Sequence, residues 1–225
     1  RAGALLLTPV LPRPHGSGRA MRAWAWLAEL AREHAVHVLV CGPPEALEPG
    51  APAATVRFLG PVLALPPLPQ QLLGLALPAI VPARPALAFD WPRPAALPAI
   101  PPPVARIVVF RLYLHHVAQA LAARFPAATL ELDMDDLESA TRAEVAGVLL
   151  RLGRPLAALR NALGAVQYRC IERGLRAGYG RAWFAAAEDL GHLGAGLARA
   201  GGVRVNRVPA PAPAAAGADA RTHLL

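Results

Sequence analysis

The sequence predicts an α/β fold with a parallel sheet, and two observations lead to this prediction. Short apolar runs alternate with longer segments in which apolar residues recur every three or four positions. The short runs are rich in Val, Leu and Ile throughout, as expected for strands buried on both faces. Strands that alternate with helices pair in parallel through crossover connections. We therefore expect one parallel sheet with helices on both faces.

The first forty residues contain one strand–helix–strand unit. Residues 4–7 form an apolar run that Pro9 ends, and a loop with a Gly-Ser-Gly turn follows. The next segment predicts an amphipathic helix, whose apolar face would carry Ala20, Trp24, Leu27 and Ala31. Residues 36–40 predict the second strand. Ligands of such folds bind at the carboxyl ends of the strands, which is where this loop lies.

The remaining chain continues the alternation. Further strands are expected at 55–59, 105–110, 128–132, 181–185 and 203–208. Helices are expected at 114–124, 142–177 and 188–200, the second of them broken near Gly153 and Pro155. Residues 61–104 are apolar and rich in Pro, which predicts short helices and an irregular cover. Residues 209–220 have the composition of a linker.

Composition narrows the class of partner. The chain has 225 residues and a formal net charge of +8, which favours a phosphate, a nucleotide or an anionic lipid. We expect no nucleic acid, because no dense arginine stripe is interleaved with aromatic residues. The isolated Cys41 and Cys170 predict reduced thiols in a cytoplasmic protein. The positive charge leaves open a peripheral contact with the anionic inner face of a membrane. Prolines within 62–82 argue against a spanning helix.

The two ends of the sequence suggest a piece of a longer protein. The chain begins at Arg1 rather than Met, and it ends on Leu224 and Leu225, an apolar pair typical of the start of another strand. We expect further sequence beyond both.

The first candidate site is the loop that contains Gly16, Ser17, Gly18 and Arg19. Glycines let the backbone approach a ligand, and the N–H groups that open a helix favour an anion. Arg19 and Arg22 oppose the helix dipole at about 0.3–1 kcal/mol each, a cost that a bound phosphate or carboxylate would reverse. A plain strand-to-helix turn with solvated arginines is the alternative. The spacing is not that of a dinucleotide-binding GxGxxG motif.

The second candidate site follows the strand at 105–110. Arg111, His115 and His116 lie where binding residues stand in this architecture. A histidine there can donate to a hydroxyl or a phosphate, or take up a proton. The alternative is a histidine that packs at the start of a helix.

The third candidate site is acidic. Residues 133–138 read Asp-Met-Asp-Asp-Leu-Glu, and these carboxylates repel one another unless water, a metal or arginines offset them. Asp133 and Asp135 could form the nucleophile loop of a haloacid-dehalogenase-like phosphatase. Alternatively, the stretch could be a polar edge on which Asp133 and Glu138 contact a sugar hydroxyl or a neighbouring arginine. A DxDD general acid of the terpene-cyclase type requires a large all-helical protein, and the alternating strands of this sequence exclude that interpretation. A solvated loop that caps a helix is the remaining alternative.

These residues resemble the N-terminal domain of group 1 (family 4-like) bacterial glycosyltransferases. The stretch LLLTPVLPRPHGSGRAMRAWAWLAELAREHAVHVLV contains the pattern Leu-Ala-x-x-His-x-Val at 30–36. Segments 111–113 and 132–139 are similar to later blocks of one bacterial branch. At 183–193 the family has Ser-x-x-Asp, where Ala186 or Ala187 replaces the Ser and Glu188 and Asp189 follow. Residues 206–210 stand in place of the interdomain Pro-Asn-Gly turn. The resemblance covers nearly the whole chain.

The resemblance implies a Rossmann-like domain that is one half of a two-domain GT-B architecture. Residues 1–208 would form the acceptor-side domain, and residues 209–225 the linker and the start of a missing C-terminal domain. The implied reaction transfers a sugar, with retention, from a nucleotide-sugar donor to a hydroxyl acceptor in glycan or polysaccharide biosynthesis. The nucleotide sugar is a co-substrate, and no other cofactor and no obligatory metal is expected. This chain alone would be inactive.

The resemblance also implies roles for the candidate residues. The loop at Gly16, Ser17 and Gly18 would approach the donor diphosphate or the acceptor. Anionic groups would bind to Arg19 and Arg111. His115 would contact the transferred sugar, and Asp133 and Asp135 would make contacts in the cleft. Two other functions remain open: a magnesium-dependent phosphatase that uses Asp133 and Asp135, and a non-enzymatic module that binds a nucleotide or a partner.

Overall fold

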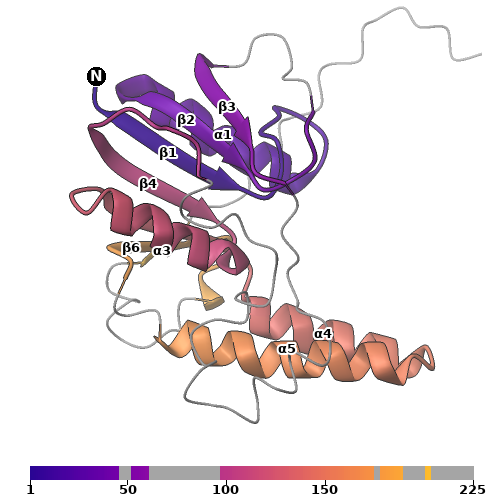
Figure 1. Ribbon diagram of the computed structural model, residues 1–225. Coiled ribbons are helices and arrows are strands. Elements are labelled where there is room, and N and C mark those ends of the chain that lie inside the picture. Colours follow the sequence, from indigo (N-terminus) through magenta and orange to yellow (C-terminus); the bar gives the residue numbers. More distant parts are fainter. Residues whose placement is uncertain (46–51, 61–96, 175–177, 190–200, 204–225) are drawn as a thin grey trace, which may run out of the picture.

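A single parallel sheet forms the centre of the computed structural model, which describes residues 1–45, 52–60, 97–174, 178–189 and 201–203 (Figure 1). Seven strands pair in the order β3-β2-β1-β4-β5-β6-β7, and all six pairings are parallel. The strands are β1 (Gly3–Thr8), β2 (Ala35–Val40), β3 (Ala54–Phe58), β4 (Val104–Phe110), β5 (Thr129–Asp135), β6 (Arg181–Phe184) and β7 (Gly201–Val203). The predicted α/β, Rossmann-like fold class is confirmed.

The described helices connect or extend these strands. They are α1 (Gly18–Glu33), the short 3₁₀ helix η3 (Leu112–Leu114), α3 (His115–Arg124), α4 (Glu138–Arg151) and α5 (Pro155–Gly174). In the described part of the chain, none of them is both long enough and apolar enough to cross a bilayer.

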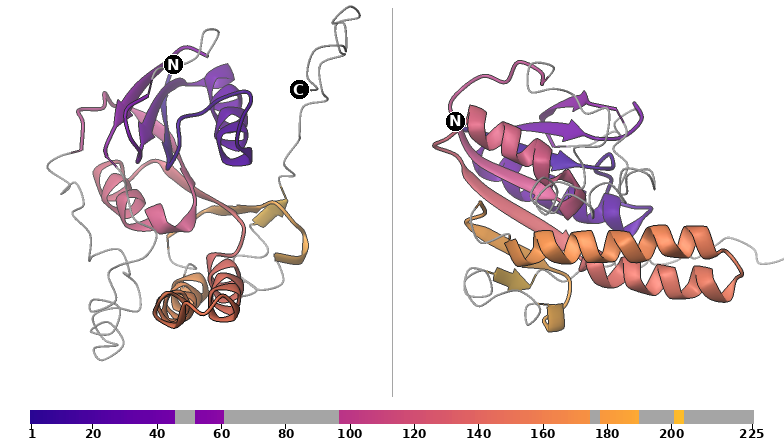
Figure 2. Two further views of the ribbon diagram at one scale, coloured as in Figure 1. Left: turned by 90° about the vertical axis from the view of Figure 1, so that its right-hand side faces the viewer. Right: turned by 60° about the horizontal axis from the view of Figure 1, so that its bottom comes forward.

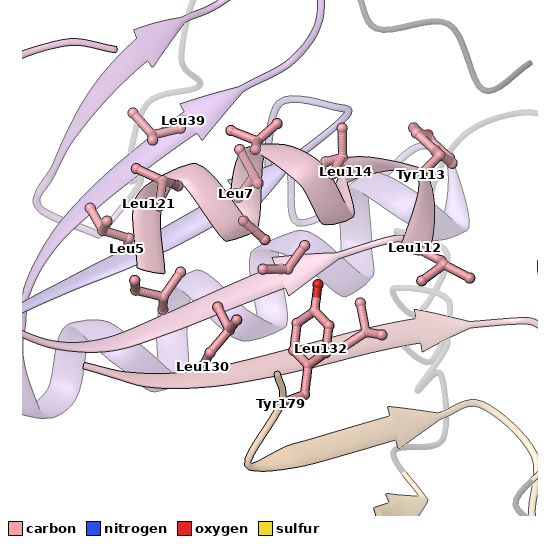
Figure 3. Packing of buried hydrophobic residues seen from close by; sticks show 14 of the residues in the cluster. Leu5, Leu7, Leu39, Leu112, Tyr113, Leu114, Leu121, Leu130, Leu132 and Tyr179 are labelled. Atoms are coloured by element: carbon pink, nitrogen blue, oxygen red, sulfur yellow. The ribbon is translucent and has the colours of Figure 1, made fainter. Parts of the chain in front are cut away.

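Helices cover both faces of the sheet, as predicted. On one face Trp26, Leu27 and Leu30 of α1 pack on strand residues that include Leu6 and Val38. On the other face Leu114 of η3 and Leu121 of α3 share one cluster with Leu5, Leu7 and Leu39, which are alternate residues of the same strands (Figure 3). This division follows from the period of two in a strand, which turns successive side chains to opposite faces.

The strand order changes direction between β1 and β4. The chain leaves β1 for α1 on one face, and it leaves β4 for η3 and α3 on the other. The connections therefore diverge beyond the carboxyl ends of these two strands, which in such sheets is where ligands bind. We call the edge formed by the carboxyl ends of the strands the carboxyl edge.

The buried face of α1 is wider than the predicted one. Ala20 and Leu27 are buried as predicted, and Trp24 and Ala31 are partly buried against the same cluster, but Trp26 and Leu30 are more deeply buried. The buried face also contains the charged Arg22. The helix is turned this way because Arg22 and Trp26, four residues apart, both donate to a buried carboxylate of the sheet.

Strand β5 is longer than predicted, and the acidic stretch begins inside it. The strand runs to Asp135 and not to residue 132. Glu131, Asp133 and Asp135 alternate with Leu130 and Leu132, so the carboxylates share the face that α1 covers. The expected loop from residue 133 is therefore wrong for its first three residues.

The long helical region is a hairpin, as the predicted break near Gly153 and Pro155 implies. Helices α4 and α5 run antiparallel side by side and project away from the sheet (Figures 1 and 2). The stretch 61–96, the helix predicted from residue 188 beyond its first two residues, residues 204–208 of the last predicted strand and the linker lie outside the described residues.

Candidate functional site

A pocket of about 270 Å³ lies at the carboxyl edge, beyond β1 and β2. Its walls are the loop after β1, the segment after β2 and the first turn of α1. The lining residues are Pro9, Val10, Leu11, Arg13, His15, Gly16, Ser17, Ala20, Val40, Gly42, Pro43 and Glu45. The predicted loop is therefore one wall of a pocket.

The shape of this loop depends on local hydrogen bonds and on two glycines. The buried Thr8 Oγ1 donates to Val10 O at 2.9 Å and accepts from Val10 N at 3.3 Å, which turns the chain just after β1. Gly16 has φ +97°, a conformation that glycine adopts without strain. A Cβ on Gly42 would lie 3.0 Å from Pro9 O, so a glycine there lets the two loops approach closely.

The N-terminus of α1 opens beside the pocket. Ser17 caps the helix, because its Oγ accepts a hydrogen bond of 3.3 Å from Ala20 N. The first turn contains Arg19 and no acidic residue, and Ser17, Gly18 and Arg19 are exposed. The positive end of the helix is thus not offset by a carboxylate of that turn, and this favours an anionic or strongly polar ligand.

An ion pair joins the two loops of the pocket. Arg13 Nη2 lies 2.7 Å from Glu45 Oε2, and both side chains are partly exposed. An exposed pair of this kind contributes little to stability. Its significance is chemical: the pocket offers a guanidinium, an imidazole from His15 and a carboxylate from Glu45 to one ligand. Hydrogen-bond donors and acceptors together suit a molecule that carries several hydroxyl groups.

A buried ionic network lies farther along the same edge and connects α1 to β5. Asp133 accepts from Arg22 Nε at 2.8 Å and from Arg22 Nη2 at 2.7 Å, and also from the indole Nε1–H of Trp26. Both charged side chains are almost fully buried, at 2% and 0% exposed. The two parallel N–H···O bonds make this a bidentate pair.

Asp135 extends this network to β4. Its Oδ1 lies 3.2 Å from Arg22 Nη1, and its Oδ2 lies 3.1 Å from Arg111 Nη1. Arg111 also pairs through Nη2 with Glu138 Oε1 at 2.7 Å. Burial alone would lower the pKa of the Arg111 guanidinium, but the carboxylates of Glu138 and Asp135 outweigh that effect and the pKa is raised. Arginines therefore offset the repulsion within the acidic stretch.

The backbone is strained at this junction. Among the described residues, only Arg111 and Asp135 combine a side chain with a positive φ, at 85° and 63°. Each such position costs about 1–3 kcal/mol and persists only where its surroundings enforce it. Here the ion pair between the two side chains joins the ends of neighbouring strands.

His115 has a different environment. Its Nδ1 lies 2.9 Å from the hydroxyl of Tyr179, and the two ring centroids are 5.6 Å apart. Burial raises the pKa of Tyr179, so the phenol keeps its proton. His115 thus contacts the core on the α3 face, although it follows the carboxyl end of β4. The side chain of His116 lies outside the described residues.

The predicted residues fall into two groups, and His115 lies apart from both. Gly16 and Ser17 line the pocket, and Gly18 and Arg19 open α1 beside it. Arg111, Asp133 and Asp135 lie together in the buried network. All three are buried, at 1%, 0% and 7% exposed, and their contacts within the structure are with one another and with neighbouring side chains. None of the three, nor His115, lines the pocket.

Sequence reasoning missed Arg13, Trp26 and Glu45, which shape this edge, and it expected Arg22 to bind a ligand and not a carboxylate of the sheet. The sequence did contain a signal for the contact of Arg22 and Trp26 with the sheet. Arg22 and Trp26 share a helix face, and a carboxylate at every second position of a strand marks a polar row opposite that face. The pairing of Arg13 with Glu45 depends on how two loops meet, which no local pattern indicates.

No protein-family model matches this chain, and no curated protein does either. One solved structure to which the chain is similar is the crystal structure of a ugt transferase from Siraitia grosvenorii in complex with UDP. The match has a TM-score of 0.34 and 12% identity, and it covers 84% of this chain. The chain spans 42% of the length of that structure.

Proposed function

We propose that this chain is the acceptor-side half of a retaining glycosyltransferase that uses a nucleotide sugar. In the proposed reaction the anomeric carbon of the donor sugar forms a bond to an acceptor hydroxyl oxygen. The bond to the nucleoside diphosphate breaks, and the hydroxyl proton is released. The resemblance at 5–40, 111–113 and 132–139 supports this class of reaction.

The observation that carries the proposal is the pocket at the carboxyl edge. Arg13, His15 and Glu45 supply donors and an acceptor around about 270 Å³, enough for a sugar ring with some of its substituents. The pocket lies one strand from the point where the strand order reverses. We assign it to the acceptor or to a phosphate of the donor.

The buried network has a positioning role in this proposal. Bonds from Arg22 and Trp26 to Asp133 fix α1 on the sheet, and the loop that lines the pocket leads directly into α1. Because α1 is fixed, the pocket loop that precedes it keeps its side chains in one geometry. This matters because correct orientation of two substrates supplies much of the barrier reduction in a transfer reaction. Contact of His115 with the transferred sugar, and of Arg111 with an anionic group, stay predictions.

A phosphatase that uses Asp133 and Asp135 is less well supported. A nucleophilic Asp must reach its substrate, but Asp133 is 0% exposed and both of its oxygens accept from Arg22. Within the described ranges, no three or more His, Cys, Asp or Glu side chains are grouped so that they could hold a metal ion.

The binding test uses two-dimensional amide NMR of this chain during titration with a panel of nucleotide sugars and with sugars alone. We expect shifts at Gly16, Ser17 and Gly42, with an affinity near millimolar, because one wall of a cleft supplies few contacts. Arg13→Ala removes the guanidinium from the pocket and should weaken binding several-fold. The matched control is Arg32→Ala, which removes an exposed arginine from the last turn of α1, at the end of the helix opposite to the pocket. Shifts confined to other regions would refute the assignment of the pocket. Micromolar binding would refute the proposal that this chain supplies only one wall of the site.

A further inference from the structure

The α4–α5 hairpin ends in a well-defined turn far from the sheet (Figure 2). Arg154 N donates to Leu149 O at 2.9 Å and Gly153 N donates to Leu150 O at 3.0 Å, so these two carbonyls near the end of α4 are satisfied. Pro155 then begins α5 at the position where its missing N–H costs nothing. The tip of the hairpin, residues 150–156, is thus held in one conformation.

The tip exposes three large apolar side chains. Leu150, Leu152 and Leu156 are 63%, 66% and 72% exposed, and they are the most exposed of the large hydrophobic residues in the described chain. They lie within seven consecutive residues at the end of a projection. Scattered single apolar residues on a surface are ordinary, but a cluster at the end of a projection marks a contact site.

The charge around the tip has one sign. Arg151 and Arg154 are exposed between the leucines. No Asp or Glu occurs from residue 145 to residue 171, whereas Arg160 and Arg169 add two more cations. A leucine cluster bordered only by arginines combines the two features that bind a protein to the surface of an anionic bilayer, which are apolar burial and attraction to anionic headgroups.

We propose that the hairpin tip docks this chain on an anionic lipid surface. Leu150, Leu152 and Leu156 would enter the boundary between headgroups and acyl chains, and Arg151 and Arg154 would contact lipid phosphates. The long aliphatic part of each arginine side chain lets its charge remain at headgroup level. This inference does not depend on the proposed function, because it uses no residue of the pocket.

A second copy of the chain is the other occupant to consider. Two tips that meet would bring four arginines together with no carboxylate from either segment 145–171. Like charges in an interface oppose association unless they are offset. The charge pattern therefore favours the lipid surface.

The test is cosedimentation with sucrose-loaded vesicles, either of phosphatidylcholine alone or of phosphatidylcholine mixed with phosphatidylglycerol. We expect binding to the mixed vesicles that weakens with added salt. Leu156→Ser should reduce binding about tenfold. Arg151→Gln with Arg154→Gln should reduce it about fivefold for each arginine and abolish the preference for phosphatidylglycerol.

The matched control is Val166→Ser, which removes a 52% exposed apolar side chain from the same helix nearer its base. It should bind as the unchanged protein does, and all variants should keep the same thermal unfolding midpoint. No binding to either vesicle type would overturn the proposal, as would equal loss from Leu156→Ser and Val166→Ser. Sedimentation velocity that shows a dimer dissociated by Leu156→Ser would assign the tip to a second copy instead.

Discussion

The buried pair of Arg22 and Asp133 constrains the carboxyl edge. Both charges lie where water does not reach, and their mutual hydrogen bonds offset the cost of desolvating them. Trp26 adds a further donor to the same carboxylate. Removing Arg22 leaves the buried Asp133 carboxylate without the guanidinium that pairs with it.

Replacing Arg22 by Met should lower the free energy of unfolding by about 3–5 kcal/mol, because Asp133 loses its bidentate partner. Urea denaturation followed by circular dichroism measures this. Arg32→Met, at an exposed position near the end of the same helix, should change stability by no more than about 0.5 kcal/mol. Equal effects of the two substitutions would show that the pair does not constrain the fold.

The sequence indicated that arginines could offset the acidic stretch, but it did not indicate which ones. Arg22 and Asp133 are 111 positions apart, so their contact depends on how α1 crosses the sheet. Charge composition alone suggested exposed arginines available to a ligand. The ion pairs of the buried Arg111 with Asp135 and Glu138 depend on how β4 packs beside β5 and α4. No local sequence pattern indicates this packing.

Among the elements, the strands with continuous apolar runs were predictable and the polar strand was not. Strands β1 and β4 are buried on both faces, so their composition alone marks them. Strand β5 has an apolar face under α3 and an acidic face under α1, and the run of Asp residues in its second half predicts a loop instead. The alternation of Leu130, Glu131, Leu132 and Asp133 is the signal that would have extended it.

The α4–α5 hairpin permits a paired test of its glycines. Gly153 has φ +68°, which a residue with a Cβ adopts only with strain, whereas Gly147 is helical with no atom within 4 Å of an added Cβ. Gly153→Ala should therefore destabilise the protein by about 1 kcal/mol. Gly147→Ala should stabilise it by about 0.5–1 kcal/mol. Thermal denaturation distinguishes the two, and changes of the same sign would contradict the described turn.

At the scale of the whole molecule, the strand order explains where a site can lie. The connections after β1 and β4 leave on opposite faces, and the pocket opens next to that divergence. The alternation of strands and helices predicted this edge from sequence. It could not predict the pocket itself, which forms because Gly42 lets the two loops approach and because Arg13 pairs with Glu45.

The central claim is that this edge is one wall of a sugar-transfer site. The most direct measurement is transfer of labelled sugar from a panel of nucleotide sugars to hydroxyl acceptors. It compares this chain with the full-length product of the gene that encodes it. We predict no turnover by this chain, turnover by the full-length product, and a loss of at least tenfold from Arg13→Ala in that product that Arg32→Ala does not share. Turnover by this chain alone, or full activity of the full-length Arg13→Ala variant, would contradict the account.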